Sequence, residues 1–483
     1  MLVLPYTFRT LALKIFICLG LVATADIFFY GHAAGWTAGI FALLLLAAVT
    51  LLSQENKGWP QIALQCLCAL LAGSALSMQA GILSTIVFAA SLLALLVAGK
   101  RQRLTSAWIV MQDMACFFGA AGQQWSHDLS IVKKLRRLRK SPPINALTTL
   151  MVVALPAVLA ALFLILFSYA NPLIAQALAK LDITTLRPYL SPVRWFIWTC
   201  IGMFVWALLR PRYRLPAKPL LGTLPTLGGW VSRSSIIWSL ALFNTLFALQ
   251  NGLDVAFLWQ HENLPAGISY AEYAHDGAYP LIVTALLAAA YVLLTYSDKR
   301  YQSAAARGLV LLWVLQNIFL VVSAIDRTLN YIDIYALTYL RLSALVWMGL
   351  VGIGLALIVV RVLGNRSNLW LLDCNLLALA ATLYICCFIN FDSYIARYNV
   401  VHSDVSGNGQ RLDIGYLEKL GPDAIAPLHW YAENTKDELQ IAHAYEAVNR
   451  LEISLEREVD HDWRAWTWHK ARLQQDLQPW KPE

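Results

Sequence analysis

The stretch LSALVWMGLVGIGLALIVV, residues 342–360, contains no charged residue and a single hydroxyl group. A helix needs roughly 20 mainly apolar residues to cross a bilayer. Within lipid, backbone polar groups must be satisfied inside the segment itself, which a helix achieves and an open strand does not. The stretch therefore predicts a membrane-spanning helix.

Similar blocks recur along the whole chain. Of all residues, 59% are apolar and 14% are charged, whereas soluble domains have about 45–50% apolar and about 25% charged residues. A soluble, collagen-like, disordered or disulfide-scaffold protein is excluded, because the apolar residues form long uninterrupted blocks. We predict an all-α fold, a polytopic helical membrane bundle of about 11 spans over residues 1–389. The blocks are 9–30, 33–53, 61–78, 80–98, 146–168, 194–210, 235–259, 278–296, 308–325, 342–362 and 369–389.

Lysines and arginines are unevenly shared between successive connections. If the N-terminus is cytoplasmic, the cytoplasmic segments carry most of them. The opposite side then receives only Lys180, Arg187, Arg194, Arg327 and Arg341. Cytoplasmic loops of membrane proteins are enriched in lysine and arginine. We therefore predict a cytoplasmic N-terminus, and an odd number of spans places the C-terminus outside the cytoplasm.

Two long polar segments interrupt or follow the bundle. The connection 100–145 contains the basic run 133–140 and is expected to lie along the membrane surface, on anionic lipid headgroups rather than on nucleic acid. The tail 390–483 is expected to form a small extracytoplasmic helical domain, with a long amphipathic helix from about Lys436 to Gln478. Membrane lipids are the expected partners, together with a possible protein bound through the tail.

Polar side chains form stripes in two of the blocks. In each stripe the spacing i, i+7, i+10 places three residues on one helical face. The stripes are Asn244, Asn251 and Asp254 in block 235–259, and Gln316, Ser323 and Asp326 in and directly after block 308–325. Polar groups at membrane depth are costly and are functional candidates. We predict that the stripes face each other or a shared wet cavity; the alternative is hydrogen bonding that only fixes packing.

A charged cluster is expected at the outer ends of these spans. Glu272 could pair with Arg327 or Arg341, which are assigned to the same side. Exposed ion pairs contribute about 0–1 kcal/mol, whereas partly buried pairs can anchor or gate a ligand. The predicted binding site consists of Asp254, Glu272, Asp326, Arg327 and Arg341, with Asn244, Asn251 and Gln316.

Motifs for metal, nucleotide or acyl-transfer chemistry do not occur in the sequence. It contains neither HExxH nor paired Cys/His spacing, and no GxxxxGK[ST], GxGxxG after a strand or GxSxG. We expect no cofactor, no metal and no catalytic residues. If the protein is an enzyme, the candidate carboxylates are Asp26, near the outer end of block 9–30, and Glu272. Otherwise Asp26 is a carboxylate paired with a nearby donor.

Small and aromatic residues predict two packing features. Gly31, Gly35 and Gly39 in and before block 33–53, and Ala69, Gly73 and Ser77 in block 61–78, recur at four-residue spacing and favour close helix approach. Trp463, Trp466 and Trp468 are expected to dock onto the membrane face, because three indoles so close together are not expected to face water.

Three separated segments together resemble a known family. They are residues 267–277 (GISYAEYAHDG), residues 390–424 with Asn390, Asp392, Asn399, Asp413 and Asp423, and residues 462–466 (DWRAW). They look like bacterial polytopic membrane proteins of a domain-of-unknown-function family (the 4153/4173 type). The resemblance implies a multi-pass protein of the bacterial cytoplasmic (inner) membrane and implies no activity.

Three classes of function follow. The first two are transport or translocation of an envelope component, and sensing or scaffolding of such a component through the tail. The alternative is a membrane-embedded enzyme acting on a lipid-linked substrate. We favour the nonenzymatic classes, because no group of residues satisfies a catalytic geometry. A closed cavity open to one leaflet would indicate lipid or enzyme work, and a central pseudo-symmetric site would indicate a transporter.

Overall fold

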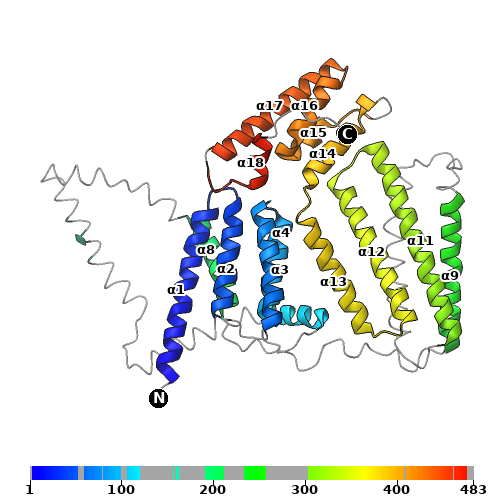
Figure 1. The fold of residues 1–483 in the computed structure, drawn as a ribbon, viewed down its shortest axis with the longest axis horizontal. Helices are drawn as coiled ribbons and strands as arrows, with labels where there is room; N and C mark the ends of the chain where they lie inside the picture. Colours follow the sequence, from blue (N-terminus) through cyan, green and yellow to red (C-terminus); the bar gives the residue numbers. More distant parts are fainter. Residues whose placement is uncertain are drawn as a thin grey trace. The chain divides into compact units, whose positions relative to one another are not determined.

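The computed structural model describes residues 3–52, 59–78, 80–98, 106–119, 191–210, 233–256, 303–406, 410–460 and 462–475, with single positions between 156 and 163. These parts are helices joined by turns, with one isolated bridge between Ser403 and Gln410. Figure 1 labels the helices. Those before residue 390 are α1 (Val3–Phe29), α2 (Trp36–Leu52), α3 (Trp59–Met78), α4 (Ile82–Ala98), α8 (Pro192–Leu209), α9 (Arg233–Asp254), α11 (Ala304–Tyr335), α12 (Tyr339–Leu363) and α13 (Asn368–Cys386). Those after it are α14 (Phe391–Val401), η4 (Asp404–Ser406), α15 (Ile414–Lys419), η5 (Gly421–Ala424), α16 (Ile425–Asn434), α17 (Glu438–Asp460) and α18 (Trp468–Gln475).

Six of the described helices are long and apolar enough to cross a membrane: α1, α8, α9, α11, α12 and α13. Shorter apolar helices cover Trp36–Leu52, Cys66–Met78, Ile82–Val97 and Ala107–Gly119. Predicted block 146–168 is described at only a few positions, and block 278–296 lies outside the described residues, as does the basic run 133–140. The described chain is thus an all-helical membrane protein, and the number of eleven spans remains a prediction.

The chain forms two compact units. The first comprises Met1–Tyr30, Ala48–Ser53 and Ala115–Arg214, and the second Gly31–Ala47, Gln54–Met114 and Leu215–Glu483. In the first unit α1 and α8 pack antiparallel. Lys14 donates to the carbonyl of Leu209 at 2.8 Å, while Asp26, at the other end of α1, binds Arg194 at the start of α8.

In the second unit, small residues bring α2 against α3. A Cβ placed on Gly39 would lie 2.7 Å from the Cβ of Ser77 and 3.2 Å from the carbonyl oxygen of Gly73. A real Cβ could not be accommodated there without moving the helices apart. The close approach predicted from the four-residue spacing is therefore confirmed at this crossing.

The helices α11, α12 and α13 follow one another antiparallel, joined by short turns. Thr338 and Ser367 cap α12 and α13, because their side chains accept hydrogen bonds from the free N–H groups of Arg341 and Trp370. In contrast, α9 and α11 run parallel: Asn244 donates to the carbonyl of Leu309 at 3.0 Å, and Asn251 to that of Gln316 at 3.1 Å.

The helices after residue 390 share one apolar core with the end of α11. Ile395, Leu417, Leu428 and Tyr431 are fully buried, and Ile332 of α11 belongs to the same cluster. Asn399 of α14 fixes the turn between α11 and α12, since its side chain accepts from the N–H of Leu337 at 2.7 Å and donates to the Leu337 carbonyl at 2.9 Å. The core therefore runs across residue 390, and a separate tail domain remains a prediction.

A turn between α17 and α18 attaches the tail to the start of α2. The backbone N–H of Trp36 donates to the carbonyl of Trp466 at 2.8 Å, and the Trp36 indole donates to the carbonyl of Trp463 at 2.9 Å. Nδ1 of His32 lies 2.6 Å from a carboxylate oxygen of Asp462. The long helix expected up to Gln478 is thus interrupted: α17 ends at Asp460, and α18 begins at Trp468.

Candidate functional site

Asp254 and Arg327, two of the predicted site residues, form a buried ion pair between α9 and α11. Asp254 has no exposed surface, and the Arg327 side chain is 7% exposed. The guanidinium donates to Oδ1 of Asp254, which also accepts from the Gln250 side chain at 3.0 Å. An uncompensated charge at membrane depth is costly, so each group neutralises the other.

Asn244 and Asn251 extend this contact along the same two helices. Each donates from its side-chain amide to a backbone carbonyl of α11, as described above, and Gln316 takes part through its carbonyl. The polar face of α9 thus lies against α11. We call this set (Asn244, Asn251, Asp254, Gln316 and Arg327) the α9–α11 seam.

The other predicted site residues do not join the α9–α11 seam. Arg341 donates to the carbonyls of Tyr335 and Ala336 and lies 4.4 Å over the Tyr331 ring, so it closes the turn between α11 and α12. The partner of Asp326 among the described residues is Asn330, at 3.4 Å. Glu272 lies outside the described residues. Of the expected five-residue cluster, the structure brings together Asp254 and Arg327.

Asp26, the candidate carboxylate of the enzyme alternative, is occupied within the first unit. Arg194 donates to both carboxylate oxygens, and the Trp198 indole donates to one of them at 2.8 Å. The guanidinium also lies 4.3 Å from the centre of the Tyr30 ring. Asp26 is thus a structural member of the α1–α8 contact.

A second polar cluster lies where the membrane helices of the second unit meet the tail. The side-chain amide of Asn390 donates to Oδ1 of Asp423 at 2.8 Å, and Nε2 of His469 lies 2.8 and 3.0 Å from the two oxygens of the same carboxylate. Asn390 also caps α14, accepting from the N–H of Ser393. These residues come from the start of α14, from η5 and from α18.

Asp392 completes this cluster. Burial raises the pKa of the Asp392 carboxyl above its usual range, and the nearby Asp423 carboxylate acts in the same direction. The Tyr339 hydroxyl, at the start of α12, interacts with this carboxyl and partly offsets the rise. We call Tyr339, Asn390, Asp392, Asp423 and His469 the boundary cluster.

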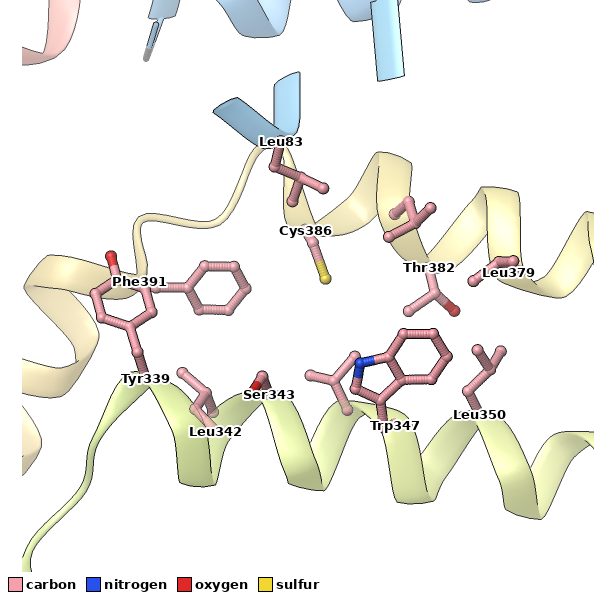
Figure 2. A pocket seen from close by; sticks show the side chains of 12 residues that line it. Leu83, Tyr339, Leu342, Ser343, Trp347, Leu350, Leu379, Thr382, Cys386 and Phe391 are labelled. Atoms are coloured by element: carbon pink, nitrogen blue, oxygen red, sulfur yellow. The ribbon is translucent and has the colours of Figure 1, made fainter. Parts of the chain in front are cut away.

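An apolar groove ends at the boundary cluster. It lies between α12 and α13, with Leu83 of α4 on its third side, and has a volume of about 170 Å³. Figure 2 shows the Trp347 indole extending from α12 toward α13, and Tyr339 and Phe391 beside one another at one end. Tyr339, Ser343 and Thr382 are the hydroxyl side chains of the lining, which is otherwise mostly aliphatic and aromatic. The groove therefore combines an apolar channel with one polar end.

The comparisons with known proteins agree with the resemblance. The family described as "Domain of unknown function (DUF4153)" matches residues 40–430. The chain belongs to the DUF4153 family. No curated protein and no solved structure matches it.

The DUF4153 match contains the groove and most of the boundary cluster. Tyr339, Asn390, Asp392 and Asp423 fall within it, whereas His469 lies beyond its end. The turn between α17 and α18, which contacts the start of α2, is likewise outside the match. His469 is therefore contributed by a part of this chain that the family description does not cover.

The boundary cluster was not predicted from the sequence. The sequence singles out Asn390, Asp392 and Asp423 only through the resemblance to the family. No periodicity links residues from four different segments. Among the described residues, no group of three or more His, Cys, Asp or Glu side chains is arranged to hold a metal ion.

Proposed function

We propose that this DUF4153 protein binds the acyl chain of a membrane lipid in the groove between α12 and α13, in order to transport or sense an envelope component. The observation that carries the proposal is the groove itself, an apolar channel between two membrane-type helices that ends at a polar cluster. Binding sites are typically apolar cavities with a few convergent polar groups.

The size of the groove supports an acyl chain as the occupant. Pockets for drug-sized ligands have about 300–1,000 Å³, whereas this groove has about 170 Å³. A single chain lying along a helix needs less room than a whole ligand. Trp347, which lines the groove, is 58% exposed, and an aromatic side chain at membrane depth is in contact with lipid.

The proposed orientation places the polar end of the groove on the extracytoplasmic side. The start of α2, the α11–α12 turn and the end of α13 all contact the tail, so these three ends share one side of the second unit. At the opposite end, Arg361 lies in the last turn of α12 and Arg366 lies between α12 and α13. Positive residues at this end favour the cytoplasm. We propose that the groove opens to the outer leaflet of a bacterial inner membrane.

A nonenzymatic role agrees better with the described residues than catalysis does. Asp26 is held by Arg194 and Trp198, which leaves its carboxylate without room to act as a base. The helices of the tail, packed on the end of α11, offer a direct route from the groove to a protein bound on the tail. This route would serve a sensor as well as a transporter.

Lipid analysis of groove-filling variants tests the proposal. The full-length protein would be purified in mild detergent, and the bound lipid would be measured by native mass spectrometry. Ser343→Phe fills the groove and is expected to remove most of the bound lipid. The matched control is Gly349→Phe on the same helix, where a Cβ would meet no described neighbour within 4 Å. Equal lipid content in wild type and both variants would overturn the proposal.

A further inference from the structure

We infer that the lipid bound in the groove carries a protonated primary amine on its headgroup, which the boundary cluster recognises through the Asp392 carboxylate. The inference rests on the proposed function and adds the chemical class of the ligand. Phe391 lines the groove, and Asp392 is the next residue along the chain. Tyr339 also lines this end of the groove, and its hydroxyl interacts with the Asp392 carboxyl, so a chain in the groove places its headgroup beside this pair.

The balance of charges in the boundary cluster favours a cation. Asp392 and Asp423 are two carboxylates, and His469, which is charged only when protonated, is the basic side chain within the cluster. Asp423 is already satisfied by Asn390 and His469. Asp392 has the Tyr339 hydroxyl as its partner and keeps acceptor capacity, because an ionised carboxylate accepts about four hydrogen bonds.

A primary ammonium group fits this acceptor better than other headgroups. It offers three N–H donors, and its hydrogen bonds to a carboxylate are roughly twice as strong as neutral ones. A quaternary ammonium has the charge without these donors, and a headgroup whose net charge is negative would face the two carboxylates. The partial burial of Asp392 strengthens the contact, because hydrogen bonds are electrostatically stronger away from bulk water.

Competition between lipids tests this inference on the full-length protein. Nanodiscs would contain equal amounts of phosphatidylethanolamine, phosphatidylcholine and phosphatidylglycerol, and the lipids retained on extraction would be counted by native mass spectrometry. We expect phosphatidylethanolamine to be enriched about tenfold over the other two, the ratio that one charge-assisted hydrogen bond gives. Asp392→Asn should abolish this enrichment while the total amount of bound lipid stays the same.

Asp333→Asn is the matched control variant. Asp333 accepts a hydrogen bond from the Tyr398 hydroxyl at 3.1 Å, so it is a second tyrosine–aspartate pair, and it does not line the groove. The enrichment should persist in this variant. Bound lipid without headgroup preference in the wild type, or a preference that survives Asp392→Asn, would overturn the inference and leave the proposed function standing. Absence of any groove-dependent lipid would overturn both.

Discussion

The α9–α11 seam and the boundary cluster differ in how their charges are balanced. In the seam one carboxylate meets one guanidinium, both buried, and the remaining contacts are amides that donate to backbone carbonyls. The boundary cluster has two carboxylates and one histidine, which contacts Asp423, and the cluster lies at the end of a groove. The two charges of the seam are paired with each other inside the contact between α9 and α11, whereas Asp392 of the boundary cluster has no guanidinium partner and lies at the end of a groove.

This difference separates a structural from a binding role for polar residues near a membrane. A single buried ion pair offsets the cost of each charge at membrane depth, so the two charges are explained without a ligand. The Asp26–Arg194 pair of the first unit follows the same rule, with a second donor from Trp198. An intramembrane charge is therefore a functional candidate only after its partner has been looked for.

Loss of Arg327 should have the largest effect of the changes considered. Arg327→Ala leaves Asp254 buried and unpaired, and breaking one partner of a buried pair costs about 3–5 kcal/mol. The thermal unfolding midpoint of the purified protein, followed by tryptophan fluorescence in detergent, should fall by several degrees. Asp254→Asn should lower the unfolding midpoint by less, because the amide oxygen still accepts a hydrogen bond from the guanidinium.

Arg194→Ala in the first unit sharpens the comparison. It should lower the midpoint by a similar amount, since Asp26 and Arg194 are both about 9% exposed in their side chains. Arg341→Ala is the control: this guanidinium binds carbonyls of a turn, and its loss leaves no carboxylate of the described residues unpaired. If the Arg327→Ala protein is as stable as the wild type, the α9–α11 seam does not have the structural role assigned to it.

Removal of His469 should have an intermediate effect. His469→Ala leaves Asp423, which is 9% exposed, with Asn390 as its remaining partner in the boundary cluster. A buried acceptor that loses one hydrogen bond costs about 1–3 kcal/mol. Circular dichroism at rising temperature measures the loss.

His443→Ala is the matched control, because His443 lies on an exposed face of α17. It should leave the unfolding midpoint unchanged. Equal midpoints for His469→Ala and His443→Ala would show that α18 does not stabilise the boundary cluster, and the comparison between the two clusters would then lose its basis.

Helix periodicity was enough to find the α9–α11 seam, but not the boundary cluster. Asn244, Asn251 and Asp254 share one helical face, so their spacing alone identified them. Asp26 and Arg194, in contrast, are 168 positions apart, and no local pattern joins them. Arg341 was assigned to a charged cluster because it lies beside a span. The three-residue turn before α12 lets its guanidinium reach back to the carbonyls at the end of α11.

The fold shows the same division between local and long-range information. Long apolar blocks and four-residue spacing of small residues act locally, and they predicted the helices and the close approach of Gly39 to Ser77. The 462–467 turn docks on α2 through its backbone carbonyls, which accept from Trp36. Every sequence has such carbonyls, so no residue pattern marks this contact. Tyr339, Asn390, Asp423 and His469 meet only because four segments converge.

Neutralising Asp392 should give the smallest change in stability, with the opposite sign. Burial raises the pKa of this carboxyl in the folded protein. The folded state therefore holds its proton more tightly than the unfolded state, where the pKa is about 3.9. The stability that this group contributes is complete below the unfolded pKa and is lost as the pH rises through the folded pKa.

Asp392→Asn removes this loss, so the variant should unfold at a slightly higher temperature than the wild type at pH 7, and at the same temperature near pH 3. The gain should stay below about 1 kcal/mol, because the carboxyl is only partly buried. Glu418→Gln is the control of opposite sign: the Arg450 guanidinium lowers the pKa of Glu418, so loss of this carboxylate should destabilise the protein at pH 7.

If Asp392→Asn raises stability and removes the preference for an amine headgroup, Asp392 is maintained for a ligand at a cost to the fold. If Asp392→Asn lowers stability, the boundary cluster has a structural role, as the α9–α11 seam does.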